Sequence, residues 1–249
     1  MEKVSVYSFP FAAGSRYSYN PFVEAAPDWM HWVSFDYPGR GRRLFEKPLL
    51  NLRDIVDDLK QVFDKNLQTP YVFYGHSMGT LVAYLLTVDF WREGRPLPQH
   101  LFLSGRGGAC IAERRRNALE MSREEIIQEI REMDGDLAAL EQNPRLFDLY
   151  ENVVRADVAA LETYDYQQTA GVRLPVPATV FIGDRDIYTP DEAALWQTEF
   201  ARPIQLHTLP GGHFFLFEHV RFILKTIEDN LSGNSYHDTK KTDLITHGI

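Results

Sequence analysis

Five short β-rich runs recur along the chain, and each is followed by a turn and a longer stretch of helical character. The runs are Val4–Phe9, His31–Phe35, Tyr71–Tyr74, His100–Leu103 and Ala178–Ile182. Strands that alternate with helices are typical of a mainly parallel sheet whose faces are covered by helices. We therefore predict an α/β fold, and a chain of 249 residues, 44% of them hydrophobic, is long enough to bury one sizeable core.

The stretches between the β-runs are of two kinds. Leu52–Leu67 repeats apolar residues at spacings of three and four, which predicts an amphipathic helix, and a second helix, Gly79–Phe90, follows the third β-run directly. Residues from about 111 to 166 are rich in Glu, Arg, Leu and Ala and contain no β-run. We expect them to form a helical lid over the carboxyl edge of the sheet, where open α/β folds bind ligands. The alternative is a few extra packing helices.

The end of the chain differs from the rest. After Leu231 the sequence continues Ser-Gly-Asn-Ser-Tyr-His-Asp-Thr-Lys-Lys, which has too few apolar side chains to pack. We expect residues 232–249 to be a polar, disordered tail. Residues 1–231 then form a single domain that contains the helical insertion.

Charge and cysteine content exclude several classes of protein. The 26 Lys and Arg against 35 Asp and Glu give a formal charge of −9, which argues against nucleic-acid binding. The one cysteine, Cys110, excludes an internal disulfide and a cysteine-based metal cluster, and fits a reducing compartment. The N-terminus lacks signal-peptide features, and no apolar run is long enough to span a membrane. We expect a cytoplasmic monomer that uses no metal and no cofactor.

The segment Gly75-His76-Ser77-Met78-Gly79 is a G-x-S-x-G motif between a β-run and a helix. A serine in such a sharp turn has a strained backbone, needs small neighbours and projects its hydroxyl clear of the sheet. It also lies at a helix N-terminus, where free N–H groups favour a developing oxyanion. Ser77 is therefore the candidate nucleophile. The plainer interpretation of the pentapeptide alone is a glycine-rich turn with a capping serine.

A nucleophilic serine needs a base and an acid, which in the α/β-hydrolase arrangement follow in the order Ser, Asp, His. The run Gly183-Asp184-Arg185-Asp186 follows the fifth β-run, and His213 lies in a later Gly-Gly-His-Phe-Phe segment. Separations of 109 residues from Ser77 to Asp186 and 27 from Asp186 to His213 leave room for the insertion and then for one helix and one short strand. Asp186 is the preferred acid because it has cleared the strand end, and Asp184 is the alternative.

Acyl transfer also needs two backbone N–H donors for the oxyanion, one after the nucleophile and one from a loop behind an early strand. Met78 occupies the first position. The loop Phe9-Pro10-Phe11-Ala12-Ala13-Gly14-Ser15 follows the first β-run and contains small residues that allow close backbone approach. Ala12 is therefore the candidate second donor, and an ordinary turn is the alternative for this loop.

Seven segments together match the pattern of one known family. They are Phe9–Gly14, Asp36–Arg43, Gly75–Gly79, Leu103–Gly105, Arg155–Asp157, Gly183–Asp186 and Pro210–Phe215. Over about residues 5 to 230 the chain resembles the type II thioesterases, the stand-alone editing enzymes of non-ribosomal peptide and polyketide synthesis. The Pro-Gly-Arg-Gly-x-Arg and Gly-Gly-His-Phe-Phe segments are the most particular to this family. The family usually has Gly-Gly where this chain has Ala13-Gly14, which leaves the identity of the second oxyanion donor open.

The resemblance implies an α/β-hydrolase fold with a mobile helical lid. It implies an enzyme that hydrolyses acyl thioesters from the phosphopantetheine arm of carrier proteins, so that the partner is an acyl or peptidyl carrier domain of a synthase. By position, the family's triad falls on Ser77, Asp186 and His213, and its oxyanion donors fall on Met78 and the Ala12 region.

Some alternatives stay open at this point. Arg40, Arg42 and Arg43 suit contacts to phosphate or to an acidic carrier protein, but ion pairs within the fold explain them equally well. A small-molecule carboxylesterase or lipase would use the same triad, and an acyltransferase or cyclase would pass the acyl group to an amine or alcohol. A non-catalytic carrier-binding protein is disfavoured by the intact Ser, Asp and His. The chain's own Met1 favours a free-standing enzyme.

Overall fold

A computed structural model of the chain describes residues 3–63, 70–113, 115–132 and 144–232. At its centre is a sheet in the order β2-β1-β3-β4-β5-β6, in which every pairing is parallel. The strands are β1 (Val4–Phe9), β2 (Met30–Ser34), β3 (Tyr71–His76), β4 (Leu101–Ser104), β5 (Ala178–Gly183) and β6 (Gln205–Leu209). The prediction of a mainly parallel α/β sheet is confirmed, and β6 is the short strand expected between the acid and the histidine.

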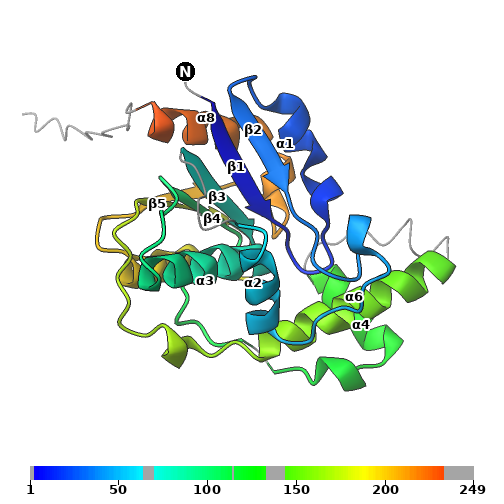
Figure 1. The fold of residues 1–249 in the computed structure, drawn as a ribbon. Helices are drawn as coiled ribbons and strands as arrows, with labels where there is room; N and C mark the ends of the chain where they lie inside the picture. The colour runs from blue at the N-terminus through cyan, green and yellow to red at the C-terminus, as the bar shows by residue number, and fades with distance from the viewer. Residues whose placement is uncertain (1–2, 64–69, 114, 133–143, 233–249) are drawn as a thin grey trace, which may run out of the picture.

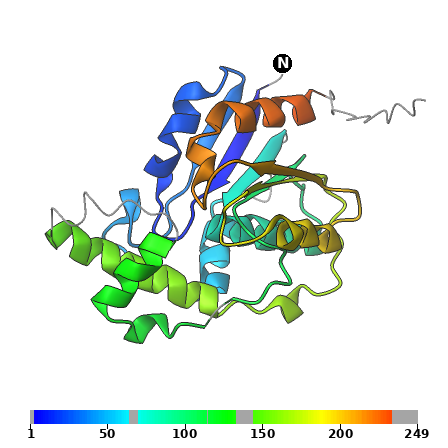
Figure 2. The same ribbon diagram turned by 180° about the vertical axis from the view of Figure 1, so that it is seen from behind.

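Helices cover both faces of the sheet (Figures 1 and 2). One face carries α1 (Asn20–Ala25) and α8 (Val220–Leu231), which contact each other, and the other carries α2 (Leu52–Lys60), α3 (Met78–Arg92) and α7 (Pro190–Ala194). Each face has its own cluster of buried side chains, because alternate residues of a strand point to opposite sides. In β3, Tyr71 and Phe73 join one cluster while Val72 and Tyr74 join the other.

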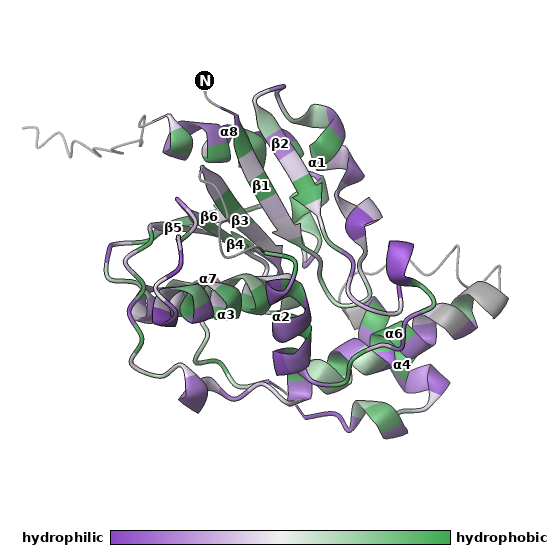
Figure 3. Cartoon of the chain, viewed as in Figure 1, coloured by the Kyte–Doolittle hydropathy of each residue, from purple (hydrophilic) through white to green (hydrophobic). Residues whose placement is uncertain are grey.

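The helix α3 lies behind the G-x-S-x-G turn and is buried from Met78 to Phe90. A helix that is mainly apolar around most of its circumference is stable inside a core, and Figure 3 shows much of α3 in green beside the sheet. Shorter 3-10 turns connect the larger elements: η1 (Arg16–Tyr19), η2 (Gly41–Arg43), η3 (Ala118–Glu120), η4 (Tyr166–Gln168), η5 (Leu195–Glu199) and η6 (Phe215–Phe217). Within the described ranges, no helix combines the length and the hydropathy needed to cross a membrane.

The helix predicted over Leu52–Leu67 is shorter than expected. α2 ends at Lys60, and residues 61–63 form a turn. The turn places the Phe63 ring in the core, with its centroid 5.5 Å from that of Phe73 and 5.7 Å from that of Phe90. The apolar spacing continued past Lys60 because Phe63 is a core residue, but its contacts require the chain to leave the helix. Residues 64–67 of the prediction lie outside the described part of the chain.

The insertion between β4 and β5 is helical, as predicted. It contains α4 (Arg123–Glu132) and α6 (Pro144–Glu162), which lie next to each other beyond the carboxyl ends of the strands (Figures 1 and 2). Its helices share a buried apolar cluster of their own, formed by Ala118, Ile126, Ile130, Phe147, Val154, Val158 and Ala159. The tail predicted over 232–249 lies, apart from Ser232, outside the described residues.

Candidate active site

Ser77 occupies the turn between β3 and α3 and has a φ of 54° and a ψ of −117°. Both flanking glycines are required by close backbone contacts. A Cβ on Gly75 would lie 2.3 Å from the carbonyl oxygen of Gly79, and a Cβ on Gly79 would lie 1.9 Å from that of Phe9. The Ser77 N–H donates to the Ser104 carbonyl at 2.8 Å, which ties the turn to the end of β4. The pentapeptide is therefore the strained strand-to-helix turn that the sequence predicts.

Three side chains that are far apart in the sequence meet at the carboxyl edge of the sheet. The Nε2 atom of His213 lies 3.0 Å from the Oγ of Ser77, and its Nδ1 atom lies 2.7 Å from the Oδ1 of Asp186. The side chains of His213 and Asp186 are almost entirely buried, with 1% and 0% of their surface exposed. A carboxylate that accepts from Nδ1–H fixes the tautomer in which Nε2 is free to accept the serine proton.

Asp184, the alternative acid, has a different set of contacts. Its Oδ1 accepts the N–H of Gly211 at 2.8 Å, and its own N–H donates to the Leu209 carbonyl at 2.8 Å. The next residue, Arg185, donates its N–H to the Gly211 carbonyl at 3.0 Å. These bonds join the loop after β5 to the loop that carries His213. Asp184 thus connects the two loops by a hydrogen bond, and Asp186 is the carboxylate that contacts the His213 imidazole.

His76, inside the motif, was assigned no role from the sequence. It is buried, its Nδ1 lies 2.9 Å from the Oγ of Ser104, and its ring centroid is 5.1 Å from that of His213. Burial holds the pKa of His76 well below its ordinary value, and the neighbouring His213 lowers it further. His76 is therefore neutral, so it adds no second positive charge beside an imidazolium at His213. Its position inside G-x-S-x-G was the one signal available.

The two candidate oxyanion donors both belong to segments that meet Ser77. Met78 is the first residue of α3, and Ala12 lines the same cavity as Ser77. Within the described part of the chain, neither N–H donates to a backbone acceptor. Phe11 to Gly14 form a tight turn closed by the Gly14 N–H and the Phe11 carbonyl at 2.9 Å. Ala13 in this turn has a φ of 61°, a conformation that favours glycine, although the sequence has alanine there.

A narrow, mainly apolar cavity opens at Ser77. Its walls come from the loop after β1, from the histidine loop and from the insertion, and its lining residues are Phe11, Ala12, Ala13, Ser77, Ile130, Tyr150, Val154, Val158, His213 and Phe214. The insertion therefore contributes the far wall of the cavity. Apolar walls beside a nucleophile suit a hydrophobic group attached to a reactive carbonyl.

Arg40 and Asp157 form a buried ion pair beside this cavity. Arg40 is 5% exposed and Asp157 0%, and the Arg40 Nη2 atom lies 2.5 Å from the Asp157 Oδ1, while Nη1 contacts Oδ2. Burial acts to lower the pKa of Arg40, but the Asp157 carboxylate, together with Tyr37 and Asp36, outweighs burial and the pKa is raised, so the guanidinium stays charged. For Arg40, the ion-pair interpretation of the arginine loop is therefore the one that the geometry supports.

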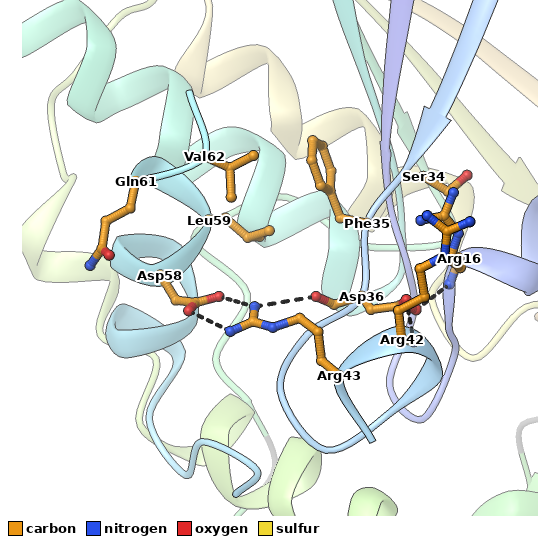
Figure 4. Close-up of a pocket in the computed structure, with 10 residues that line it drawn as sticks. All are labelled: Arg16, Ser34, Phe35, Asp36, Arg42, Arg43, Asp58, Leu59, Gln61 and Val62. Carbon is orange, nitrogen blue, oxygen red and sulfur yellow. Dashed lines mark hydrogen bonds and ion pairs between the residues drawn. The ribbon is translucent and has the colours of Figure 1, made fainter. Parts of the chain in front are cut away.

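Arg43 is also paired within the fold. Its Nη2 atom lies 2.8 Å from the Oδ1 of Asp58, and its Nη1 donates to the Asp36 carbonyl (Figure 4). Its Nε also donates to a carboxylate oxygen of Glu46. Arg43, Asp36 and Asp58 line a second cavity, between η2 and the end of α2. None of the three residues that meet at the sheet edge lines it. Arg42 is exposed, and its N–H donates to the Asp36 Oδ2 at 3.0 Å.

The parallel sheet, the strained serine turn and the chain order Ser, Asp, His together define an α/β-hydrolase. The thioesterase domain family model matches residues 5–231, and the chain belongs to this family of enzymes. The gramicidin S biosynthesis protein GrsT of Aneurinibacillus migulanus is 28% identical over 217 residues, which cover 87% of this chain and 84% of that protein.

Two solved structures are similar along nearly the whole chain. One is RedJ, a thioesterase from the prodiginine biosynthetic pathway in Streptomyces coelicolor. It is 29% identical with a TM-score of 0.84, and the match covers 92% of this chain and 86% of that one. The other is the type II thioesterase BorB from the borrelidin biosynthetic cluster, 31% identical with a TM-score of 0.82 over 92% of this chain and 93% of that one. The α/β-hydrolase fold and the thioesterase family expected from the sequence are confirmed.

Proposed function

We propose that this thioesterase is a type II editing enzyme, which hydrolyses acyl thioesters from the phosphopantetheine arm of carrier proteins in non-ribosomal peptide or polyketide synthesis. The observation that carries the proposal is the continuous hydrogen-bonded arrangement of Ser77, His213 and Asp186. The names of GrsT, RedJ and BorB, which place those proteins in biosynthetic pathways, support the substrate class.

In the acylation step, the Ser77 Oγ attacks the thioester carbonyl carbon while the Nε2 of His213 takes the hydroxyl proton. The carbonyl oxygen becomes negatively charged and accepts hydrogen bonds from the N–H groups of Met78 and Ala12. Asp186 accepts from the Nδ1–H of His213 and stabilises the imidazolium. The carbon–sulfur bond then breaks and the electron pair leaves on sulfur, which takes the proton from Nε2 or leaves as a thiolate.

In the deacylation step, a water molecule replaces the thiol. The Nε2 of His213 removes a proton from this water, and the resulting hydroxide attacks the acyl-enzyme carbonyl. Collapse of the second oxyanion breaks the bond to Ser77, whose oxygen recovers the proton from Nε2. The neutral His76 matters in both steps, because a second cation beside the imidazolium would oppose its formation.

The surroundings of the site fit an acyl thioester. A thiol is a better leaving group than an amine, so the reaction depends on attack and oxyanion stabilisation more than on protonation of the leaving atom. The apolar side chains Val154 and Val158 of α6 give the acyl chain a dry wall opposite the loop after β1. We propose that the enzyme works in the cytoplasm as a monomer, with no metal and no cofactor beyond the phosphopantetheine of its substrate.

The test compares hydrolysis of acetyl and longer acyl groups on phosphopantetheinyl carrier protein with hydrolysis of a p-nitrophenyl ester, for wild type and Ser77→Ala. We expect the carrier-bound thioesters to be the better substrates and Ser77→Ala to lose activity on both. A much better rate on the simple ester would make the enzyme a carboxylesterase. Full activity of Ser77→Ala would refute the triad itself.

A further inference from the structure

Asp157 links three segments that are distant in the sequence. It lies on α6, its side chain is buried, and its carboxylate pairs with Arg40. The same Oδ2 atom accepts the backbone N–H of Ala13 at 2.6 Å, and the Arg40 Nη1 lies 3.4 Å from the Gly14 carbonyl. Asp157 of α6 and Arg40 of the loop after β2 therefore both contact the Phe11–Gly14 turn, which carries the candidate oxyanion donor.

These contacts of Asp157 and Arg40 determine the orientation of the Ala12 N–H. A peptide unit is planar, so the Ala12 N–H has a fixed direction relative to the Phe11 carbonyl. That carbonyl accepts the Gly14 N–H and closes the turn. Asp157 holds the intervening Ala13 N–H, and Arg40 approaches the carbonyl of Gly14. Contacts that hold Ala13 and Gly14 in place therefore also hold the Phe11–Ala12 peptide plane, which contains the Ala12 N–H.

The turn needs this support because of its own sequence. The φ of Ala13 is 61°, and a side chain in that region is strained, whereas glycine adopts it freely. The Ala13 side chain packs against the apolar cluster of the insertion, in which Val154 and Val158 lie on the same helix as Asp157. The insertion therefore compensates the strain twice, through the hydrogen bond to Ala13 and through packing of its methyl group.

We propose that Asp157, with Arg40 as its counter-charge, is a positioning residue that holds the Phe11–Gly14 turn with the Ala12 N–H directed at the oxyanion. This inference rests on the proposed function. It makes α6 both a wall of the acyl cavity and the anchor of the oxyanion turn. If α6 moves away, Ala13 loses its acceptor and the second donor loses its fixed direction.

The test uses two double variants that differ in one property. Arg40→Met with Asp157→Asn removes both charges but keeps an amide oxygen that can accept the Ala13 N–H. Arg40→Met with Asp157→Leu removes the charges and the acceptor, and buried pairs replaced by apolar groups commonly leave a protein folded. The matched control is Asp58→Asn, which removes the charge that pairs with Arg43, a residue of the same loop as Arg40. Its kcat should stay within about twofold of the wild-type value.

We expect kcat of the Leu variant to be about 10- to 100-fold below that of the Asn variant, with KM changed less than about threefold. Full loss of one oxyanion donor costs roughly 100- to 1000-fold, so a misdirected donor should cost less. Affinity for a trifluoromethyl ketone, whose adduct with Ser77 carries the oxyanion, should fall by a similar factor. Equal kcat and equal inhibitor affinity in two folded variants would overturn the inference.

Two further measurements keep the outcome unambiguous. If either variant fails to fold, hydrogen exchange of the wild type decides the question. The Ala13 N–H should exchange no faster than α6 moves away from the turn, because Asp157 accepts it. Exchange as fast as in an exposed loop overturns the proposal. Ser77→Ala is assayed in parallel. Loss of activity there with identical Asn and Leu variants refutes the positioning role alone, whereas an active Ser77→Ala refutes the proposed function and this inference with it.

Discussion

The backbone of Ser77 should store strain that can be measured. Its φ of 54° and ψ of −117° lie in a region that residues with a Cβ rarely adopt, and such conformations cost about 1–3 kcal/mol. Ser77→Ala removes the hydroxyl and keeps the Cβ, whereas Ser77→Gly removes both. The difference in unfolding free energy between the two variants therefore isolates the strain, and neither needs to be active.

Glycine also has more freedom in the unfolded chain, which offsets about 0.5–1 kcal/mol of the gain. We expect Ser77→Gly to be more stable than Ser77→Ala by about 0.5–2 kcal/mol. In a chain of this size, each kcal/mol raises the melting temperature by roughly 2–4 °C. Urea unfolding followed by tryptophan fluorescence, together with thermal melts, measures the difference. A Ser77→Gly variant that is equal to or less stable than Ser77→Ala would show that the turn is not strained.

Three other changes test the remaining features. Asp186→Asn should leave the fold intact and lower kcat by about 1000- to 10000-fold, because the imidazole loses the partner that fixes its tautomer; a rate near wild type would exclude Asp186 as the acid. Gly79→Ala should lower the unfolding free energy by about 3 kcal/mol in urea titrations, because its Cβ would lie 1.9 Å from the Phe9 carbonyl oxygen; an unchanged midpoint would contradict this. Burial lowers the pKa of His100 from 6.5 to about 4. Between pH 6.5 and pH 4 the unfolded chain binds a proton at His100 that the folded chain does not. The contribution of His100 to the unfolding free energy is therefore complete above pH 6.5 and is lost as the pH falls, by about 2 kcal/mol near pH 5. His100→Gln should lose that part of the pH dependence of urea unfolding, and identical slopes in variant and wild type would refute the assignment.

The strands were the most predictable part of the fold. β1 was predicted over Val4–Phe9 and is found there, and the bounds of the other four predicted strands differ by at most two residues. Short runs of β-branched and aromatic residues between turn residues explain this success. The end of α2 was not predictable in the same way, because Phe63 continues the helical spacing while it packs against the aromatic core of the sheet.

The site was predictable where its chemistry is local. Ser77, Asp186 and His213 each lie within three residues of a glycine near the end of a strand, and the structure brings them to hydrogen-bond distance. The ion pair of Arg40 with Asp157 was not predictable, because its members are 117 residues apart and their pairing depends on how the insertion packs. The sequence showed both residues within family-like segments but gave no reason to connect them.

The position of the insertion has a consequence for exchanging substrate range between related enzymes. The chain leaves the sheet after β4 and returns at β5, so the acid and histidine loops both follow the insertion and are joined to each other through Asp184 and Gly211. A chimera that receives a foreign insertion would keep this joined pair of loops. It would also need a carboxylate at the place of Asp157 to meet Arg40. The acyl cavity can therefore be redesigned as a replaceable module, provided that the ion pairs of Asp157 with Arg40 and of Glu113 with Arg106 are kept where the insertion meets the catalytic core.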